Sequence, residues 1–280
     1  MNSIESRCFR LFKLAVGITL LVNLLALSGM VVEAAEKLAF PEKFIIRLSS
    51  ISIRDADTDL TVLSSDNLGT GFSFVDDLGG DDSLTIPRID GYYRFNPAHR
   101  VEFGTFRIER DGRNLLTIDV DIGDETYSIG DTVISSINYE LLKIGYAYSF
   151  YHSQAVELSV TAGLHMTNYE FDYELVDGTS ADSSEASGPL PMFGFRVSYA
   201  INPRWSIHYL SEVLFVEAGD AEGSFQNYEL DIRYKLNENF MLGAGLTRFS
   251  IDVTTKDSDW DGRIADTHYG IAVSGHYFIN

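Results

Sequence analysis

The most motif-like stretch of the sequence is DSDWDGR, in which carboxylates stand at alternate positions. Asp257, Asp259 and Asp261 are followed directly by Gly262. Carboxylates at this spacing, with a glycine for a sharp turn, form the first half of a calcium-binding loop. The second half is missing, because His268 stands where such a loop needs a bidentate Glu. The pattern therefore favours an acidic, solvated loop over a dedicated metal site, and we expect no cofactor beyond weak Ca²⁺ or Mg²⁺ binding by such loops.

A second set of candidate residues consists of charges of both signs on the polar faces of alternating segments. The set comprises Arg88, Asp90, Arg94, Lys143, Glu157, Arg196, Glu212, Glu229, Asp231, Arg233 and Lys235. A buried charge is tolerated when it is paired, whereas an unpaired one costs several kcal/mol, on the order given for ion burial. If these side chains share one interior, they either pair and close it or line a narrow polar path.

Alternation of apolar and polar residues predicts the elements that carry these charges. From Ala155 to Met166, six apolar residues face one way and mostly small or polar residues face the other. A period of two over that length indicates a β-strand. The polar faces are rich in Gly, Ser, Ala and Thr, which fit a narrow barrel interior, whereas a soluble sandwich carries long solvated side chains there. Aromatic residues at strand ends, such as Tyr148, Phe150 and Trp205, are typical of the girdles of membrane barrels.

The connections between the predicted strands alternate between short and long. The short ones are 96–99, 151–154, 201–204 and 236–239, and the longer polar ones are roughly 54–85, 111–133, 174–188, 217–223 and 255–266. Transmembrane barrels have short periplasmic turns and longer outer loops. The sequence therefore predicts an all-β fold, a transmembrane antiparallel up-and-down β-barrel of about ten strands, with eight as the alternative count.

The predicted strands lie near 44–53, 86–95, 100–110, 138–150, 155–172, 190–200, 204–216, 224–236, 239–254 and 267–279. The segment 115–122 also alternates, which predicts a hairpin that extends beyond the membrane.

The N-terminus has the pattern of a secretory signal. The basic segment Arg7–Lys13 precedes an apolar run over 14–30, and small residues end at Ala34. This predicts a cleaved signal peptide at 1–34 and a single outer-membrane β-barrel domain at 35–280. The alternative is an uncleaved anchor, for which the apolar run is at the short limit.

Composition excludes several classes of protein. The chain has 280 residues, 45% of them hydrophobic, and a formal net charge of −20. That apolar content is too high for a disordered chain, and the acidity argues against nucleic acid as a partner. The single cysteine, Cys8, lies in the predicted signal, so the predicted barrel has no disulfide and no thiolate chemistry.

Several features together resemble the small outer-membrane β-barrel proteins of Gram-negative bacteria, the broad OmpA/OmpW-like group. They are the signal, the Asn-Pro turns at 96–97 and 202–203, the alternating strands and the final strand HYGIAVSGHYFIN. The resemblance covers essentially the whole chain after the signal. It implies a location in the bacterial outer membrane, insertion by the barrel-assembly machinery, and contact with outer-membrane lipid and lipopolysaccharide. Such barrels usually end on an aromatic residue, whereas here Ile279 and Asn280 follow Phe278.

A second resemblance, to the ten-stranded omptin proteases of the same membrane, rests on two short motifs. Omptins use an Asp pair and an Asp-x-His pair at the outer rim to activate water. Asp119-Val-Asp121 and Asp266-Thr-His268 are similar to these pairs, but the second lies in the last loop and not in the one that the omptin pattern requires. Short Asp pairs also arise easily among 41 acidic residues. An omptin-like protease is therefore a distant alternative.

Two non-enzymatic functions remain from the sequence. The first is a narrow, porin-like channel for small ions or solutes, which requires a connected polar path with the charges kept on its walls. The second is a structural or surface-interaction barrel with a plugged lumen and cation-binding acidic loops. The two differ in whether the lumen charges bridge the middle of the barrel.

Overall fold

The computed structural model describes residues 38–62, 71–117, 119–122, 125–178, 181–218, 221–256 and 261–280. The predicted signal peptide at 1–34 lies outside these residues. Within the described ranges, no helix is long and apolar enough to cross a membrane.

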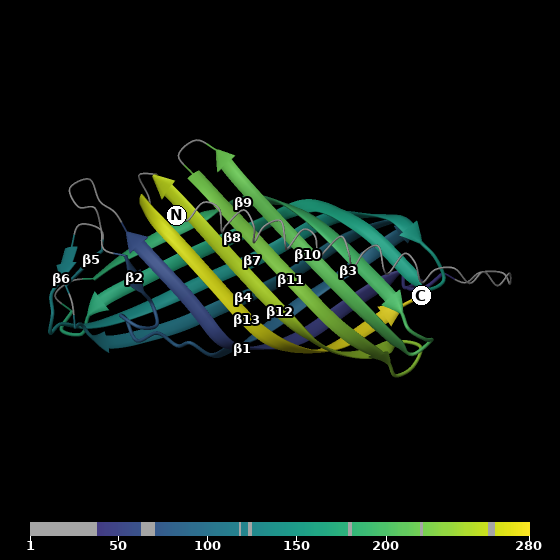
Figure 1. Ribbon diagram of the computed structural model, residues 1–280, viewed down its shortest axis with the longest axis horizontal. Helices are drawn as coiled ribbons and strands as arrows, with labels where there is room; N and C mark the ends of the chain where they lie inside the picture. Colours follow the sequence, from purple (N-terminus) through teal and green to yellow (C-terminus); the bar gives the residue numbers. More distant parts are fainter. Residues whose placement is uncertain are drawn as a thin grey trace, which may run out of the picture. The chain divides into compact units, whose positions relative to one another are not determined.

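Ten long strands form one closed antiparallel barrel (Figure 1). They are β1 (Phe44–Val62), β3 (Leu84–Asn96), β4 (His99–Leu115), β7 (Thr132–His152), β8 (Val156–Leu175), β9 (Ala181–Ala200), β10 (Trp205–Ala218), β11 (Ala221–Lys235), β12 (Phe240–Lys256) and β13 (Asp261–Ile279). Each pairs with its neighbour along the chain, and β13 pairs with β1 from Phe44↔Ile279 to Val62↔Gly262, which closes the wall. The all-β, up-and-down, ten-stranded prediction is confirmed, and the alternative count of eight is wrong.

Short turns join the strands at one end of the barrel, which we call the turn end; the opposite end is the loop end. The turn end contains the four predicted short turns, for example the Asn-Pro turn between β3 and β4. Three short strands, β2 (Phe72–Ser73), β5 (Val120–Ile122) and β6 (Glu125–Tyr127), lie at the loop end (Figure 1). Within the described residues, β5 and β6 pair with each other, so the end of the predicted segment 115–122 belongs to a separate small hairpin, whereas its first residue, Leu115, ends β4.

The turn-end half of the barrel carries an apolar band on its outer surface. Aliphatic and aromatic side chains are exposed there, as the alternation predicted, and aromatic residues such as Tyr148, Trp205 and Tyr277 lie toward the turns. A lipid-facing barrel wall requires this pattern. We call this surface the membrane band; its exposed side chains include Leu48, Ile89, Tyr93, Leu142, Ile144, Tyr146, Val160, Leu164, Met166, Phe193, Leu230, Ile232, Leu242, Leu246, Ile271 and Val273.

In the loop-end half, the two faces of the wall exchange their polarity. On β7, Leu142 faces outward within the membrane band, but the next outward positions toward the loops are Glu140 and Asn138. Their inward neighbours Tyr139 and Ile137 are buried and apolar. The loop-end half therefore has the pattern of a soluble barrel, with a polar outside and an apolar core.

This inversion explains why the predicted strands are too short. The sequence predicted loops at 54–85 and 174–188, yet β1 continues to Val62 and β9 begins at Ala181. The strands extend beyond the membrane band, and there their outward side chains, such as Asp57 and Asp59, are polar. A search for strands with an apolar outer face therefore assigns these strand ends to loops.

The loop end has one place where a separate segment completes the wall. β3 and β4 pair only up to Arg88↔Phe106, because Pro87 precedes Arg88 and has no N–H to donate. Residues 71–83 fill the gap between β1 and β4, where Phe74 N–H donates to Thr58 O at 2.9 Å and Asp81 N–H donates to Asp111 O at 3.1 Å.

Candidate functional site

Inside the membrane band, charged side chains form one connected network that we call the charged layer. Its members are buried or nearly buried and come from all parts of the wall except β12 and β13. They are Arg47, Arg88, Asp90, Arg94, Arg100, Glu102, Lys143, Glu157, Arg196, Glu212, Glu229, Asp231 and Arg233.

One end of the charged layer is centred on Arg47. Its Nε lies 2.8 Å from Asp90 Oδ2 on β3, and its Nη2 lies 2.9 Å from Glu229 Oε2 on β11. Arg88 Nε lies 3.0 Å from Asp90 Oδ1, and Arg88 also contacts Glu229. Asp231 accepts from Arg233 Nε at 2.5 Å. Every carboxylate in this part therefore has a guanidinium partner.

The other end is centred on Glu157 of β8. Arg100 Nη1 lies 2.6 Å from Glu157 Oε1, and Arg94 Nη2 lies 3.0 Å from the same oxygen. Ser149 Oγ also donates to this carboxylate. Arg100 Nε reaches back to Glu102 Oε1 at 2.9 Å, which extends the network along β4.

Lys143 and Asn227 join the two ends. Lys143 Nζ contacts Glu212 and lies 3.5 Å from Glu102 Oε2. Asn227 Nδ2 donates to Glu212 Oε2 at 2.9 Å and to Glu229 Oε1 at 3.4 Å. The contacts therefore continue without a break from Arg47 to Glu157.

Several of these contacts cross the lumen. Arg94 on β3 and Glu157 on β8 are separated by β4 and β7, and Lys143 on β7 and Glu212 on β10 are separated by β8 and β9. Side chains of opposite sign therefore meet in the middle of the barrel and do not stay on its walls. The diameter of a barrel grows with its strand number, and at ten strands the long charged side chains of opposite walls still reach one another.

Ten of the eleven charges singled out from the sequence lie in the charged layer. The exception is Lys235, whose Nζ lies 5.1 Å from the centre of the Phe278 ring near the turn end. Sequence reasoning missed Arg47, Arg100 and Glu102. The sequence pattern could have identified them, because in the predicted strands 44–53 and 100–110 these three residues stand at the alternate positions that face inward.

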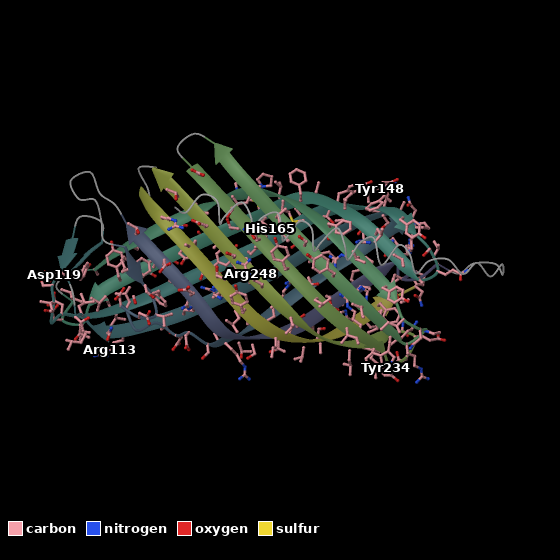
Figure 2. All side chains as sticks on the ribbon, viewed as in Figure 1. Arg113, Asp119, Tyr148, His165, Tyr234 and Arg248 are labelled. Carbon is pink, nitrogen blue, oxygen red and sulfur yellow. The ribbon has the colours of Figure 1, made fainter. Side chains whose placement is uncertain are left out.

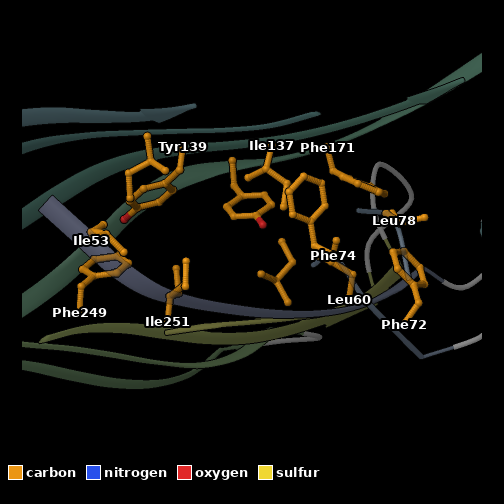
Figure 3. Close-up of a cluster of buried hydrophobic side chains, with 14 of the residues drawn as sticks. Ile53, Leu60, Phe72, Phe74, Leu78, Ile137, Tyr139, Phe171, Phe249 and Ile251 are labelled. Atoms are coloured by element: carbon orange, nitrogen blue, oxygen red, sulfur yellow. The ribbon is translucent and has the colours of Figure 1, made fainter. Parts of the chain in front are cut away.

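Above the charged layer, toward the loops, the lumen is filled by apolar side chains (Figure 3). We call this cluster the apolar layer. Phe74 and Leu78 of the segment that completes the wall are fully buried in it, and the Phe74 ring meets Phe171 edge to face at 6.4 Å. Its buried members include Ile53, Leu60, Phe72, Phe74, Leu78, Ile86, Ile108, Ile137, Tyr139, Tyr169, Phe171, Leu214, Phe225, Phe249, Ile251 and Ile264.

Three small cavities lie near the junction of the two layers. Their volumes are about 30, 10 and 20 Å³, and Arg88 lines all three. A single water needs roughly 10–15 Å³ of such space. These cavities therefore have room for individual waters but not for a hydrated ion in transit.

A small polar cluster around Asp266 is buried within the apolar layer. Asp266 accepts hydrogen bonds from Thr58 Oγ1 at 2.6 Å and from His268 Nε2 at 2.7 Å, and Arg110 Nη1 lies 3.8 Å away. Burial acts to raise the pKa of the Asp266 carboxyl, but His268, Thr58 and Arg110 together hold this pKa below its ordinary value. The carboxylate is therefore stabilised in its charged form.

The same burial acts on the neighbouring groups of the loop-end half. It raises the pKa of the Tyr139 hydroxyl, and the Asp266 charge adds to the effect. Burial likewise raises the pKa of Tyr169, with Asp266 as the second cause. Burial lowers the pKa of Arg110, which Asp266 partly offsets. These shifts follow from the apolar surroundings.

The structure does not bring the omptin-like residues together into an open site. Asp266 and His268 are only 4% and 2% exposed. Asp119 lies at the loop end (Figure 2), where its Oδ1 accepts a hydrogen bond from Ile129 N–H at 2.7 Å. The side chain of Asp121 is outside the described part of the chain. None of the contacts described for Asp266 and His268 involves Asp119.

The predicted cation loop is mostly outside the described residues. This applies to Asp257 and Asp259, while Asp261 begins β13 and only its backbone is described. Among the residues that the structure does describe, no group of three or more His, Cys, Asp or Glu side chains is arranged to hold a metal ion.

Solved structures that resemble this chain are barrels of the bacterial outer membrane. The crystal structure of the outer membrane protease OmpT from Escherichia coli matches with a TM-score of 0.54 and 10% identity, over 88% of this chain and 100% of that chain. The transport unit of the autotransporter AIDA-I from Escherichia coli matches with a TM-score of 0.45 and 7% identity, over 90% of this chain and 94% of that chain.

The outer membrane protein OprG from Pseudomonas aeruginosa matches with a TM-score of 0.38 and 14% identity, over 85% of this chain and 96% of that chain. No protein-family model matches the sequence, and a search of curated proteins found no match. At these identities the likeness concerns the fold alone. At that level, the resemblance to outer-membrane β-barrels is confirmed.

Proposed function

We propose that this chain is a closed, non-conducting barrel of the bacterial outer membrane that acts at the cell surface through its loop-end half. The observation that carries the proposal is the bridging of the lumen by the charged layer, exemplified by the Arg94–Glu157 and Lys143–Glu212 contacts. The apolar layer supports it, because a packed apolar core gives a hydrated ion no replacement for its water. The membrane band supports the outer-membrane location.

The test is single-channel conductance of the refolded chain in a planar bilayer. We expect no conductance steps from protein whose folding is verified by heat-modifiable gel migration and whose insertion is verified by protease protection. Reproducible steps would contradict the closed barrel and favour a narrow channel for small ions. In that case Arg94→Ala or Glu157→Ala should change the ion preference.

The role proposed for the loop-end half is non-enzymatic contact with the envelope surface. Its outward side chains include acidic residues of β1 and β4, namely Asp57, Asp59, Glu109 and Asp111. Carboxylates that face lipopolysaccharide can share the divalent cations that neutralise its phosphates. We therefore propose outer-membrane lipid and lipopolysaccharide as the chain's partners, with insertion by the barrel-assembly machinery and with no nucleic-acid partner.

Weak cation binding at the acidic loop can be tested with Tb³⁺, which binds at Ca²⁺ sites and luminesces when a nearby tryptophan is excited. Trp260 lies within DSDWDGR, and the second tryptophan, Trp205, lies at the turn end. We expect luminescence that Ca²⁺ displaces and that Asp259→Asn weakens. Trp260→Phe is the control that removes the local sensitiser without removing a carboxylate. Luminescence that survives Asp259→Asn would argue against this loop.

A further inference from the structure

Residues Leu38–Glu42, directly before β1, lie across the turn end of the barrel, and we call them the strap. Ala39 N–H donates to Ser153 O at 2.9 Å, in the turn between β7 and β8. Three strands separate β1 from β8 on one side of the wall and five on the other. The strap therefore crosses most of the width of the turn-end mouth.

The strap has a fixed, strained conformation. Phe40 has a φ of 51°, in the left-handed region that costs a residue other than glycine roughly 1–2 kcal/mol. Its ring meets the His208 ring edge to face at 5.2 Å, and Glu42 is only 6% exposed. Strain of this kind persists only where the surroundings hold the segment in place.

His152 is the side chain that fastens the strap. Its Nε2 lies 2.5 Å from Ala39 O, and its Nδ1 lies 3.0 Å from Pro97 O in the turn between β3 and β4. A carbonyl oxygen can only accept a hydrogen bond, so both ring nitrogens must donate. The neutral imidazole has one N–H, and only the protonated ring has two. Both bonds therefore exist together only when His152 carries its proton.

Charged groups of both signs lie around His152. Glu157 stands opposite His152 in the β7–β8 ladder. Arg94 Nη1 donates at 2.9 Å to the same Pro97 carbonyl that His152 contacts. Arg100 pairs with Glu157. The strap itself adds the carboxyl of Glu42, which is buried.

We propose that His152 is a pH-operated latch, which in its protonated form bonds both the strap and the β3–β4 turn and on losing its proton keeps only one of these two bonds, so that the strap loosens. Imidazole side chains change charge between pH 5 and 8, so the strap is fastened at the acidic end of this range and loosened at the other. The latch goes beyond the proposed function. The two layers close the lumen without the strap, so either idea can fail while the other stands.

The experiment measures the mobility of a nitroxide spin label at Leu38→Cys, in a chain that also carries Cys8→Ser, from pH 5 to pH 8 by electron paramagnetic resonance. We expect the immobile component to dominate at pH 5 and the mobile component to grow several-fold by pH 8. The matched control is a label at Leu236→Cys in the turn between β11 and β12, whose side chain is 51% exposed and whose spectrum should not change. An unchanged spectrum at Leu38 would overturn the latch.

Substitutions at position 152 separate the latch from other titrations. His152→Ala should leave the label mobile at every pH, and His152→Arg, which keeps the charge and several N–H donors, should leave it immobile. His99→Gln removes a histidine that bonds Tyr146 and not the strap, so it should preserve the pH profile, as should Glu42→Gln. A pH profile that survives His152→Ala, or that disappears in Glu42→Gln, would overturn the proposal. Heat-modifiable migration verifies that each variant is folded.

Discussion

The guanidinium of Arg88 on β3 contacts the carboxylate of Glu229 on β11, although three strands separate β3 from β11 on the shorter way around the wall. The contact therefore spans the lumen. Glu229 also accepts from Arg47 on β1, the neighbour of β3, so a single carboxylate of β11 ties its strand to the β1–β3 pair on the other side of the lumen. The interior of the membrane band is held together by such contacts, and their loss has measurable consequences.

Removing one partner of this pair should destabilise the barrel strongly. Glu229→Leu leaves Arg88 and Arg47 without a buried counter-charge, and breaking such a pair costs about 3–5 kcal/mol. Urea unfolding in detergent micelles measures the loss. The matched control is Asp252→Ala, which breaks the exposed bidentate pair with Arg263 on the outer wall, where we expect less than about 1 kcal/mol. Equal losses at the two sites would contradict a bridged, buried network.

Asp266 should make the stability of the loop-end half depend on pH. Its pKa is lower in the folded chain than in the unfolded chain, so its stabilising contribution is fully present above the unfolded value and disappears as the pH falls through the folded value. The expected result is that acid unfolding of the wild type includes a stability loss below about pH 4 that Asp266→Asn lacks. Denaturant midpoints between pH 2 and pH 6 measure it. Parallel pH profiles for the two proteins would show that Asp266 is not stabilised in its charged form.

The ladder between β9 and β10 should lengthen when two prolines are replaced. It ends at Val213↔Phe193, although β9 continues to Ala181 and β10 to Ala218. Pro191 and Pro189 follow on β9 in the direction of the loops, and proline has no N–H to donate. Pro189→Val with Pro191→Val restores two donors, each worth roughly 1 kcal/mol when paired. Slower amide hydrogen exchange over residues 214–218 of β10 is the expected result.

Pro87→Val is the control for this change. Pro87 also stands where a ladder stops, between β3 and β4, but the segment 71–83 already occupies the place of the missing pairs. An N–H group restored at position 87 has no unpaired strand to which it could donate, so amide hydrogen exchange in β4 should not slow. If the β9–β10 ladder stayed short without its prolines, side-chain packing rather than the missing N–H groups would set its length.

The sequence alone predicts the architecture well because a wall with lipid outside and charges inside gives a strict period of two. Leu142–Phe150 on β7 shows this, since its outward residues are exposed and its inward residues are buried. The loop-end half could not be predicted in the same way. There Tyr139 faces inward and Glu140 outward, which is the pattern of a soluble core, and nothing in the local sequence marks where the membrane ends.

The candidate site was predictable in its members but not in its connections. The alternation of inward and outward positions along a strand places Arg94 and Glu157 inside the barrel. Their contact, however, depends on which strands lie opposite each other once the ten strands have closed into a barrel. The polar cluster at Asp266 was beyond sequence reasoning for the same reason. Its partners Thr58 and Arg110 come from β1 and β4, more than 150 residues away along the chain.

Phe74→Ala should separate the roles of the two layers. The Phe74 ring is fully buried, meets Phe171, and lies 4.9 Å beneath the Arg110 guanidinium. Its loss should cost about 3–5 kcal/mol of unfolding free energy, because a cavity replaces a buried aromatic ring. Ile129→Ala is the control, because that side chain is 65% exposed and its loss should change stability little.

Bilayers containing folded Phe74→Ala should show no conductance steps, because the Lys143–Glu212 contact still bridges the lumen below the apolar layer. Conductance steps in this variant would show that the apolar layer is the barrier and that the charged layer is permeable.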